Sequence, residues 1–384
     1  MRAQAPGSPR QSWGTVFVEA AMADVALSKT DILRIVVGYA ADQGFLFFGL
    51  VCKDWREAWG QRPTTTSSVP TSETSVSQLR YSFECGAPRN YTRVCTAIAR
   101  LGNVALLRCA KDYGCPWNSS TFATAARGGS KDVVKYLALK GCPWNLRACS
   151  SAAAGGHLAI LQWLRERGCP WDSTTCSYAA DGAHLDVLRW ARAGDCPWNE
   201  ATCAAAASKG HLNVLKWARA NGCMWDTRTC ESAAKQGHLE VLVWARGHDC
   251  PWSKTTCSLA ASGGHLDVLR WARANGCEWD QSTCSLAARG GHLSCLQWAR
   301  ENGCPWSFMT CSVAASGGHL AVLQWARSHG CPWTSQTCLA AAKFGHLKVL
   351  RWAIENGCDW NKARCLAVAK GRRHAHVVAW ISGT

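Results

Sequence analysis

The chain has 384 residues, is 48% hydrophobic and carries a formal net charge of +16. It has no run of about 18 apolar residues and no apolar signal-peptide core near its start, so neither a membrane-spanning helix nor secretion is expected. An intracellular protein of the cytoplasm or nucleus is therefore predicted, with its 24 cysteines reduced.

Two stretches precede the main part of the chain. Residues 1–23, whose one apolar patch from Val16 to Ala23 is interrupted by Glu19, are predicted to be a disordered extension. Residues 24–60 contain two apolar patterns of helical spacing, Ile32 to Val37 and Phe47 to Trp55, with Gln43-Gly44 between them. A helical segment of about 35 residues is too small to be stable by itself, so it needs a neighbour or a partner.

The second of these patterns contains Val51-Cys52-Lys53 followed by Trp55-Arg56, and it resembles the second half of an F-box. The proline that follows the first leucine of an F-box is replaced here by Ser28. The resemblance implies binding to the small adaptor subunit of a cullin-type ubiquitin ligase. The residues that would make this apolar contact are Leu33, Val36, Leu50, Val51 and Trp55. The alternative is a helical cap or handle for the rest of the chain.

Residues 61–80 are rich in Ser and Thr and are predicted to be a flexible linker. The remainder, residues 81–384, is a repeat array. In it Cys-Pro-Trp, or a close variant, recurs every 27 residues, with the cysteine at Cys115, Cys142, Cys169, Cys196, Cys223, Cys250, Cys277, Cys304, Cys331 and Cys358. A fixed period of this length indicates a solenoid of about eleven units, each buried only by its neighbours. The first unit is degenerate, with Asn103 at the usual histidine, as expected of an end cap.

Each unit is predicted to form two short antiparallel helices, as the stretch from Ser253 to Trp279 illustrates. Ser253, the residue after the repeat tryptophan, is a good helix N-cap, and the same holds in all ten units. Gly263-Gly264 ends the first helix, and a second helix with an apolar stripe begins after His265. No period-2 strand pattern interrupts the array, so the fold class is all-α.

The segment from Thr255 to Trp279 resembles the ankyrin repeat, in which Thr-Pro-Leu-His-x-Ala-Ala is followed by Gly-His-x-x-Val-Val, Gly-Ala and a buried Val. The family's unit has about 33 residues, and the residues missing here lie between Trp279 and Thr283, where a β-hairpin finger would project. The resemblance implies a curved, ankyrin-type solenoid with shortened hairpin loops. It also implies a structural hydrogen-bonding role for His157, His184, His211, His238, His265, His292, His319 and His346.

Cysteine occurs twice per unit at small-residue positions, which favours buried thiols that pack as small hydrophobes. A zinc array is the alternative, because Cys257 and His265 recur as a pair, but the closely spaced ligand pairs of zinc knuckles are absent. No metal and no cofactor are predicted. The loop tryptophans, such as Trp225, and those of the second helices, such as Trp244, are expected to be buried.

A basic ridge follows the second helices. Its arginines are spaced 27 residues apart, at Arg165, Arg192, Arg219, Arg246, Arg273, Arg300 and Arg327. The conservative interpretation is a solvated outer face whose long side chains cover the tryptophans, with some cation–π stabilisation. The functional alternative is a basic stripe that attracts nucleic acid or an acidic partner.

No enzymatic activity is predicted. The recurring cysteine and histidine pairs are identical from unit to unit, whereas an active site is a single asymmetric constellation. The array also lacks a phosphate-binding loop and a nucleophile elbow.

Positions that change between units are free for recognition, because the constant ones form the scaffold. The unusual apolar pair Phe308-Met309 is the best candidate anchor, since aromatic residues dominate binding hot spots. The other candidates are variable first-helix residues: Glu200, Glu231, Lys254, Gln281, Asp181, Lys235 and Arg289. The sequence thus predicts a protein-binding scaffold, tied by its front segment to a ubiquitin ligase, with nucleic-acid binding as the alternative.

Overall fold

The computed structural model describes residues 74–84 and 92–383. The predicted extension, the F-box-like segment and most of the predicted linker lie outside these ranges. The chain divides into two units, Met1–Trp117 and Asn118–Thr384, which are described separately. In the described part of both, the secondary structure is helical and contains no strand. None of these helices is both long and apolar enough to cross a bilayer.

The described part of unit 1 has three helices, α4 (Val76–Glu84), α5 (Thr92–Leu101) and α6 (Val104–Asp112). Helix α4 begins inside the stretch predicted to be linker, so that boundary was wrong by several residues. The reason is a capping box. The hydroxyl of Ser75 accepts a hydrogen bond from the backbone amide of Gln78 (3.2 Å), and the side chain of Gln78 accepts one from the amide of Ser75 (2.7 Å).

Unit 2 consists of ten helix pairs. The first helices are α7 (Ser119–Gly128), α9 (Leu146–Ala154), α11 (Ser173–Asp181), α13 (Glu200–Ser208), α15 (Thr227–Gln236), α17 (Lys254–Gly263), α19 (Gln281–Gly290), α21 (Phe308–Gly317), α23 (Ser335–Phe344) and α25 (Lys362–Gly371). The second helices are α8 (Lys131–Leu139), α10 (Leu158–Glu166), α12 (Leu185–Ala193), α14 (Leu212–Ala220), α16 (Leu239–Arg246), α18 (Leu266–Ala274), α20 (Leu293–Glu301), α22 (Leu320–Ser328), α24 (Leu347–Glu355) and α26 (Ala375–Gly383). With α5 and α6, the described residues hold the predicted eleven pairs.

The helix starts lie where the sequence places them. In unit 2 the residue after each repeat tryptophan is an N-cap whose side chain accepts a hydrogen bond from the first turn. Asp172, for example, accepts from the amide of Thr174 at 3.0 Å. The prediction of an all-α solenoid of helix pairs without β-hairpin fingers is confirmed in the described residues.

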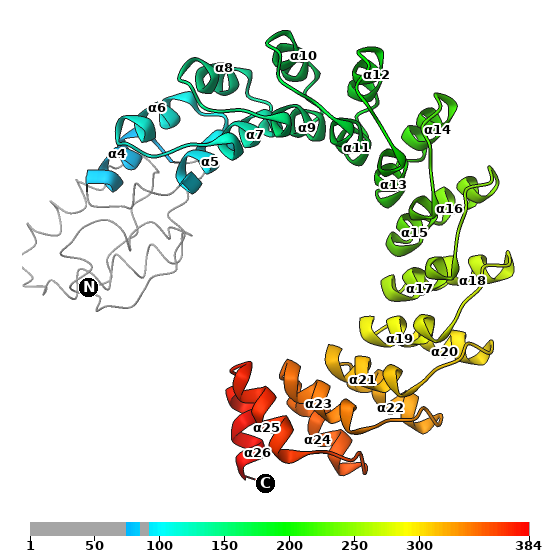
Figure 1. Ribbon diagram of the computed structural model, residues 1–384. Helices are drawn as coiled ribbons and strands as arrows, with labels where there is room; N and C mark the ends of the chain where they lie inside the picture. Colours follow the sequence, from blue (N-terminus) through cyan, green and yellow to red (C-terminus); the bar gives the residue numbers. More distant parts are fainter. Residues whose placement is uncertain (1–73, 85–91, 384) are drawn as a thin grey trace, which may run out of the picture. The chain divides into compact units, whose positions relative to one another are not determined.

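Side-chain size explains the curvature of unit 2. The first helices bury alanine, cysteine and threonine, so that successive first helices pack directly on one another. The second helices bury larger residues, such as Val268 and Leu269, and contact each other little. The first helices therefore form the inner row of the arc and the second helices the outer row (Figure 1).

The tryptophans lie in the outer wedge between repeats, and the prediction that they are buried was wrong for all those described but one. Of those described, Trp163 is buried at 9% exposure and the others are half-buried. Trp252, for example, packs edge-on against Trp271 with ring centroids 6.0 Å apart, and the guanidinium of Arg246 covers it at 4.3 Å. The divergence of the second helices leaves a gap there that large aromatic side chains fill only partly.

Candidate partner-binding surface

The inner surface is defined here as the exposed side chains of the first helices of unit 2. Its frame is held by contacts between neighbouring units. One of them is a histidine bridge: Nε2 of His292 donates a hydrogen bond to the carbonyl of Ser262, 30 residues earlier, at 3.0 Å. A carbonyl only accepts, so Nε2 carries the proton. The same bridge is made by His157, His211, His319, His346 and His374.

Two glycines lie beside the bridge of His292. The ring of His292 occupies the space that a Cβ would need at Gly264 and at Gly290, where the nearest ring atoms would lie at about 2.5 Å. Gly264 also has a φ of 79°, which side chains rarely adopt. The structural hydrogen-bonding role that the ankyrin resemblance implied is thus confirmed for five of the eight predicted histidines, His157, His211, His292, His319 and His346. The structure shows no such side-chain hydrogen bond for His184, His238 and His265 among the described residues.

The cysteines form a second structural series. None of the 22 cysteines in the described residues forms a disulfide, and all are buried. The thiol of Cys277 donates to the carbonyl of Ser253 in the N-cap (3.3 Å), and the thiol of Cys257 lies 3.9 Å from the carbonyl of Cys277. A hydrogen bond to the neighbouring thiol and burial raise the pKa of Cys257 far above its usual range, so this thiol stays protonated. No group of three or more metal-ligating side chains is present in the described part of the chain.

The basic ridge also has a structural role. Nη1 of Arg219 donates to the carbonyl of Cys223 at 2.5 Å, and its guanidinium covers Trp225 at 4.1 Å. The equivalent contacts are made by Arg165, Arg192, Arg246, Arg273, Arg300 and Arg327. Each guanidinium already binds a loop and an aromatic face, which leaves fewer of its donors for a phosphate.

The candidate recognition residues are all on first helices, and the side chains of four of them bond to other residues of unit 2. Lys254 pairs with Asp280 at 2.8 Å, and this pair lowers the pKa of Asp280. Asp181 lies 4.0 Å from Lys209. Glu231 accepts a hydrogen bond from the hydroxyl of Ser253 at 3.1 Å.

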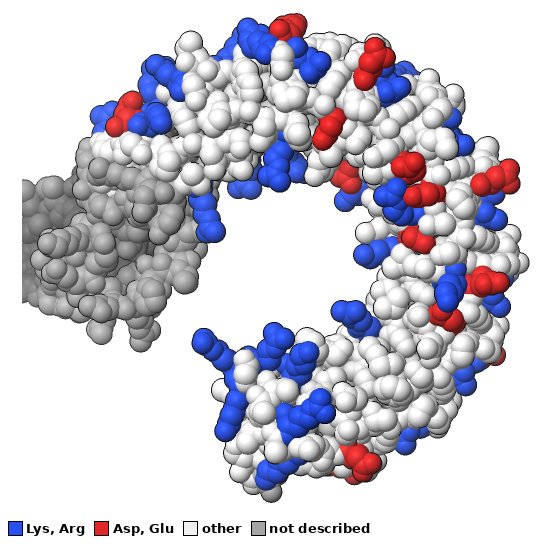
Figure 2. Space-filling model, in the orientation of Figure 1, with Lys and Arg blue, Asp and Glu red and all other residues white. Residues whose placement is uncertain are grey.

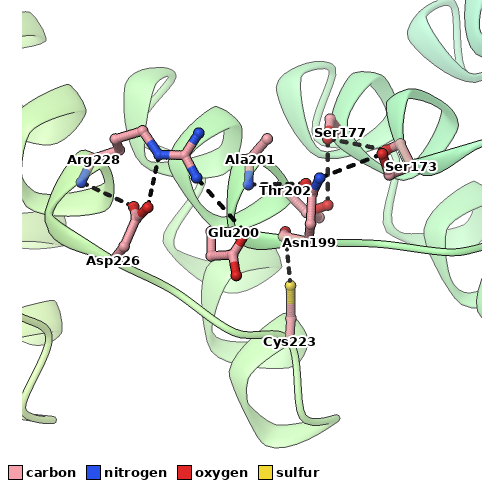
Figure 3. Close-up of polar contacts among 9 residues, drawn as sticks. All are labelled: Ser173, Ser177, Asn199, Glu200, Ala201, Thr202, Cys223, Asp226 and Arg228. Atoms are coloured by element: carbon pink, nitrogen blue, oxygen red, sulfur yellow. Dashed lines mark hydrogen bonds and ion pairs between the residues drawn. The ribbon is translucent and has the colours of Figure 1, made fainter.

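Glu200 belongs to the network in Figure 3, where Arg228 reaches both Asp226 (2.8 Å) and Glu200 (3.7 Å). A second hydrogen bond in this network connects residues 24 positions apart in the chain: the thiol of Cys223 donates to the carbonyl of Asn199 at 3.4 Å. The charges in this middle part of the inner surface are therefore largely paired with one another.

Five candidates remain available. Phe308 and Met309 are 40% and 47% exposed at the start of α21. Lys235, Gln281 and Arg289 are exposed, and their side chains form no ion pair or hydrogen bond within the described residues. These five are spread over three first helices, α15, α19 and α21.

The sequence analysis missed Phe344, which is 50% exposed at the end of α23. Its neighbour Lys343 has its amine 5.5 Å from the ring centroid. The signal was present in the sequence, because only this repeat has an aromatic residue at this position. Seven other repeats have glycine there: Gly128, Gly155, Gly182, Gly263, Gly290, Gly317 and Gly371. The predicted F-box contact residues Leu33, Val36, Leu50, Val51 and Trp55 lie outside the described residues.

No protein-family model matches the sequence, and no curated protein has a significant match to it. Among solved structures, the chain is similar to the crystal structure of the human ASB11 ankyrin repeat domain. The identity is 16% and the TM-score 0.37, with 47% of this chain and 96% of that chain covered. A similarity of this size assigns no residue roles.

Proposed function

We propose that the chain is a non-enzymatic scaffold whose solenoid binds a partner protein on the inner surface. The observation that carries the proposal is the contrast between constant and variable positions. The constant histidines, cysteines and ridge arginines bond to the backbone of the array, whereas the exposed first-helix residues differ from repeat to repeat. A solenoid with a fixed frame and a variable inner row can present different side chains along one partner.

Phe308 and Met309 are the proposed anchor, because exposed aromatic and methionine side chains are enriched in protein interfaces. The test replaces them with the residues of the next unit, as Phe308→Ser and Met309→Gln. The matched control, Lys216→Gln with Arg270→Gln, alters exposed outer positions where other units have Gln. Partner recovery from cell extract should fall at least about tenfold for the inner variant and stay unchanged for the outer one. Loss only in the outer variant would move the binding site to the second helices.

The front segment gives the proposal a second part, carried by its resemblance to an F-box. We propose that residues 24–60 bind the adaptor subunit of a cullin-type ubiquitin ligase and so tie the bound partner to that ligase. Val51→Asp with Trp55→Ala should abolish co-purification of the adaptor and leave the helical signal of the repeats unchanged. If the unmutated protein also fails to co-purify an adaptor, this segment is a helical cap or handle instead.

A further inference from the structure

The inner surface changes character toward the C-terminus. The four first helices α19, α21, α23 and α25 contain no Asp or Glu, and residues 281–384 as a whole hold 11 Lys or Arg against three Asp or Glu. Figure 2 shows Lys and Arg gathered over this end of the arc with few Asp or Glu among them. The cations on these four helices are Arg289, Lys343, Lys362, Arg364 and Lys370. They are exposed and form no ion pair within the part of the chain that the structure describes.

This pattern differs from that of the preceding helices. From α11 to α17 most cations of the first helices and their caps have acidic neighbours, as in Lys209 with Asp181 and Lys254 with Asp280. Lys235 is the exception among the described residues. Beyond α17 the acidic neighbours are missing and the cations remain. Such a local excess of one charge attracts a ligand of the opposite charge and raises its association rate.

Apolar side chains lie on three of the same helices. Leu286 and Val313 are half-buried at equivalent positions of α19 and α21, and Met309 and Phe344 are largely exposed on α21 and α23. The charged backbone of a nucleic acid gains little from contact with apolar side chains, whereas a peptide can pack its own apolar residues against them. The ridge arginines, which would best suit a phosphate backbone, are already bonded to loops and tryptophans.

We propose that α19, α21, α23 and α25 bind an acidic segment of the partner protein that also carries apolar side chains. The proposal rests on the scaffold function above and specifies the chemistry of its ligand. The chain's own front part does not fit, because residues 1–73 hold seven Lys or Arg and seven Asp or Glu. With first helices about 10 Å apart, an extended segment of about ten residues crosses the four helices.

The test measures binding of fluorescein-labelled peptides to the full chain by fluorescence anisotropy. The probe alternates Glu with Leu over about ten residues, and its matched control has Gln in place of Glu. The acidic peptide should bind at least about tenfold more tightly than the Gln peptide, and its affinity should fall as salt is raised. Equal binding of the two peptides, or failure of both to bind, would overturn the proposal.

Two sets of variants locate the site. Lys343→Gln with Lys370→Gln should weaken acidic-peptide binding about tenfold, whereas the outer variant Lys216→Gln with Arg270→Gln, which removes the same charge, should leave it unchanged. Phe344→Gln, which introduces the residue of an earlier unit (Gln236), should weaken it by a smaller factor. Equal loss in the inner and outer charge variants would show a non-specific charge effect and overturn the proposal. Circular dichroism checks that each variant is folded.

An oligothymidylate of similar length is the third probe. Tighter binding of this oligonucleotide than of the acidic peptide would assign the patch to nucleic acid and contradict the inference. The scaffold proposal is tested separately by the Phe308 and Met309 variant. If that variant loses its partner while the acidic peptide fails to bind, only the acidic-ligand inference falls; if neither effect occurs, both fall.

Discussion

At the scale of single residues, the repeated side chains act between units. A histidine bridges to the preceding unit, a loop thiol bonds to a helix N-cap, and an arginine covers a tryptophan. Each such contact recurs along the array. Other positions also keep one residue in most repeats, and a repeat with a different residue there shows what the common residue contributes. Ala183, at a position that is usually glycine, and Cys295, at one that is usually valine, are two such differences.

Ala183 has a φ of 60°, where most units have glycine. Because a side chain is strained in this region of φ, Ala183→Gly should raise the free energy of unfolding by about 0.5–1 kcal/mol. Gly210→Ala, at the equivalent position of the next unit, should lower it by about 1–3 kcal/mol, since the new Cβ would lie 2.8 Å from the ring of His238. Urea denaturation measures both. A destabilised Ala183→Gly variant would show that the strain argument is wrong.

Cys295 stands where most second helices have valine, and burial raises the pKa of its thiol to about 11. The folded state therefore disfavours the thiolate, so stability that is present below the unfolded pKa of 9.0 is lost as pH rises toward 11. Relative to Cys295→Val, the parent chain should lose about 1.4 kcal/mol per pH unit above pH 9. Denaturant melts of the two proteins between neutral pH and pH 10.5 (about half a unit below that raised pKa) measure the difference. A difference that does not change with pH would contradict the prediction.

At the scale of helices, the inner row is held by hydrogen bonds as well as by small-residue packing. The hydroxyl of Ser258 on α17 lies 3.2 Å from that of Thr283 on α19, and both are buried. The equivalent of Ser258 on α13 is Ala204, and the hydroxyl of Thr229, on the next first helix, is buried with no partner among the described residues.

Ala204→Ser should supply the missing partner of Thr229 and raise the free energy of unfolding by about 0.5–1.5 kcal/mol. The reverse change, Ser258→Ala, should lower it by about 1–3 kcal/mol, because Thr283 would be left buried without its bond. Thermal and urea melts measure both changes. The argument fails if the two substitutions shift stability in the same direction.

At the scale of unit 2, the main helix contacts run within each helix pair and between neighbouring pairs, so each pair depends on the ones beside it. Such an array has no central core, and its stability is close to a sum over units and their interfaces. Whole repeats can be removed only in register, because the interfaces from Asn118 to Trp360 share one 27-residue spacing.

Deletion of Cys250 to Gly276, one complete unit, should therefore leave a folded array with the same helical signal per residue and a lower free energy of unfolding. Deletion of Lys254 to Gly263 alone removes α17 and leaves α18 unpaired. That variant should lose helical signal beyond the deleted residues. Circular dichroism and hydrogen exchange compare the two, and an equal loss in both would contradict the register argument.

The sequence alone determined the fold class, the number of helix pairs and their starts, because these depend on local signals that every unit repeats, such as the N-cap after each tryptophan. It also named Phe308 and Met309, which are exposed on the inner row. Only the tertiary structure showed that the tryptophans are half-buried and that Glu231 is bonded to Ser253. Burial and pairing depend on how adjacent units diverge and on which side chains meet across them, and the spacing within one unit does not contain that information.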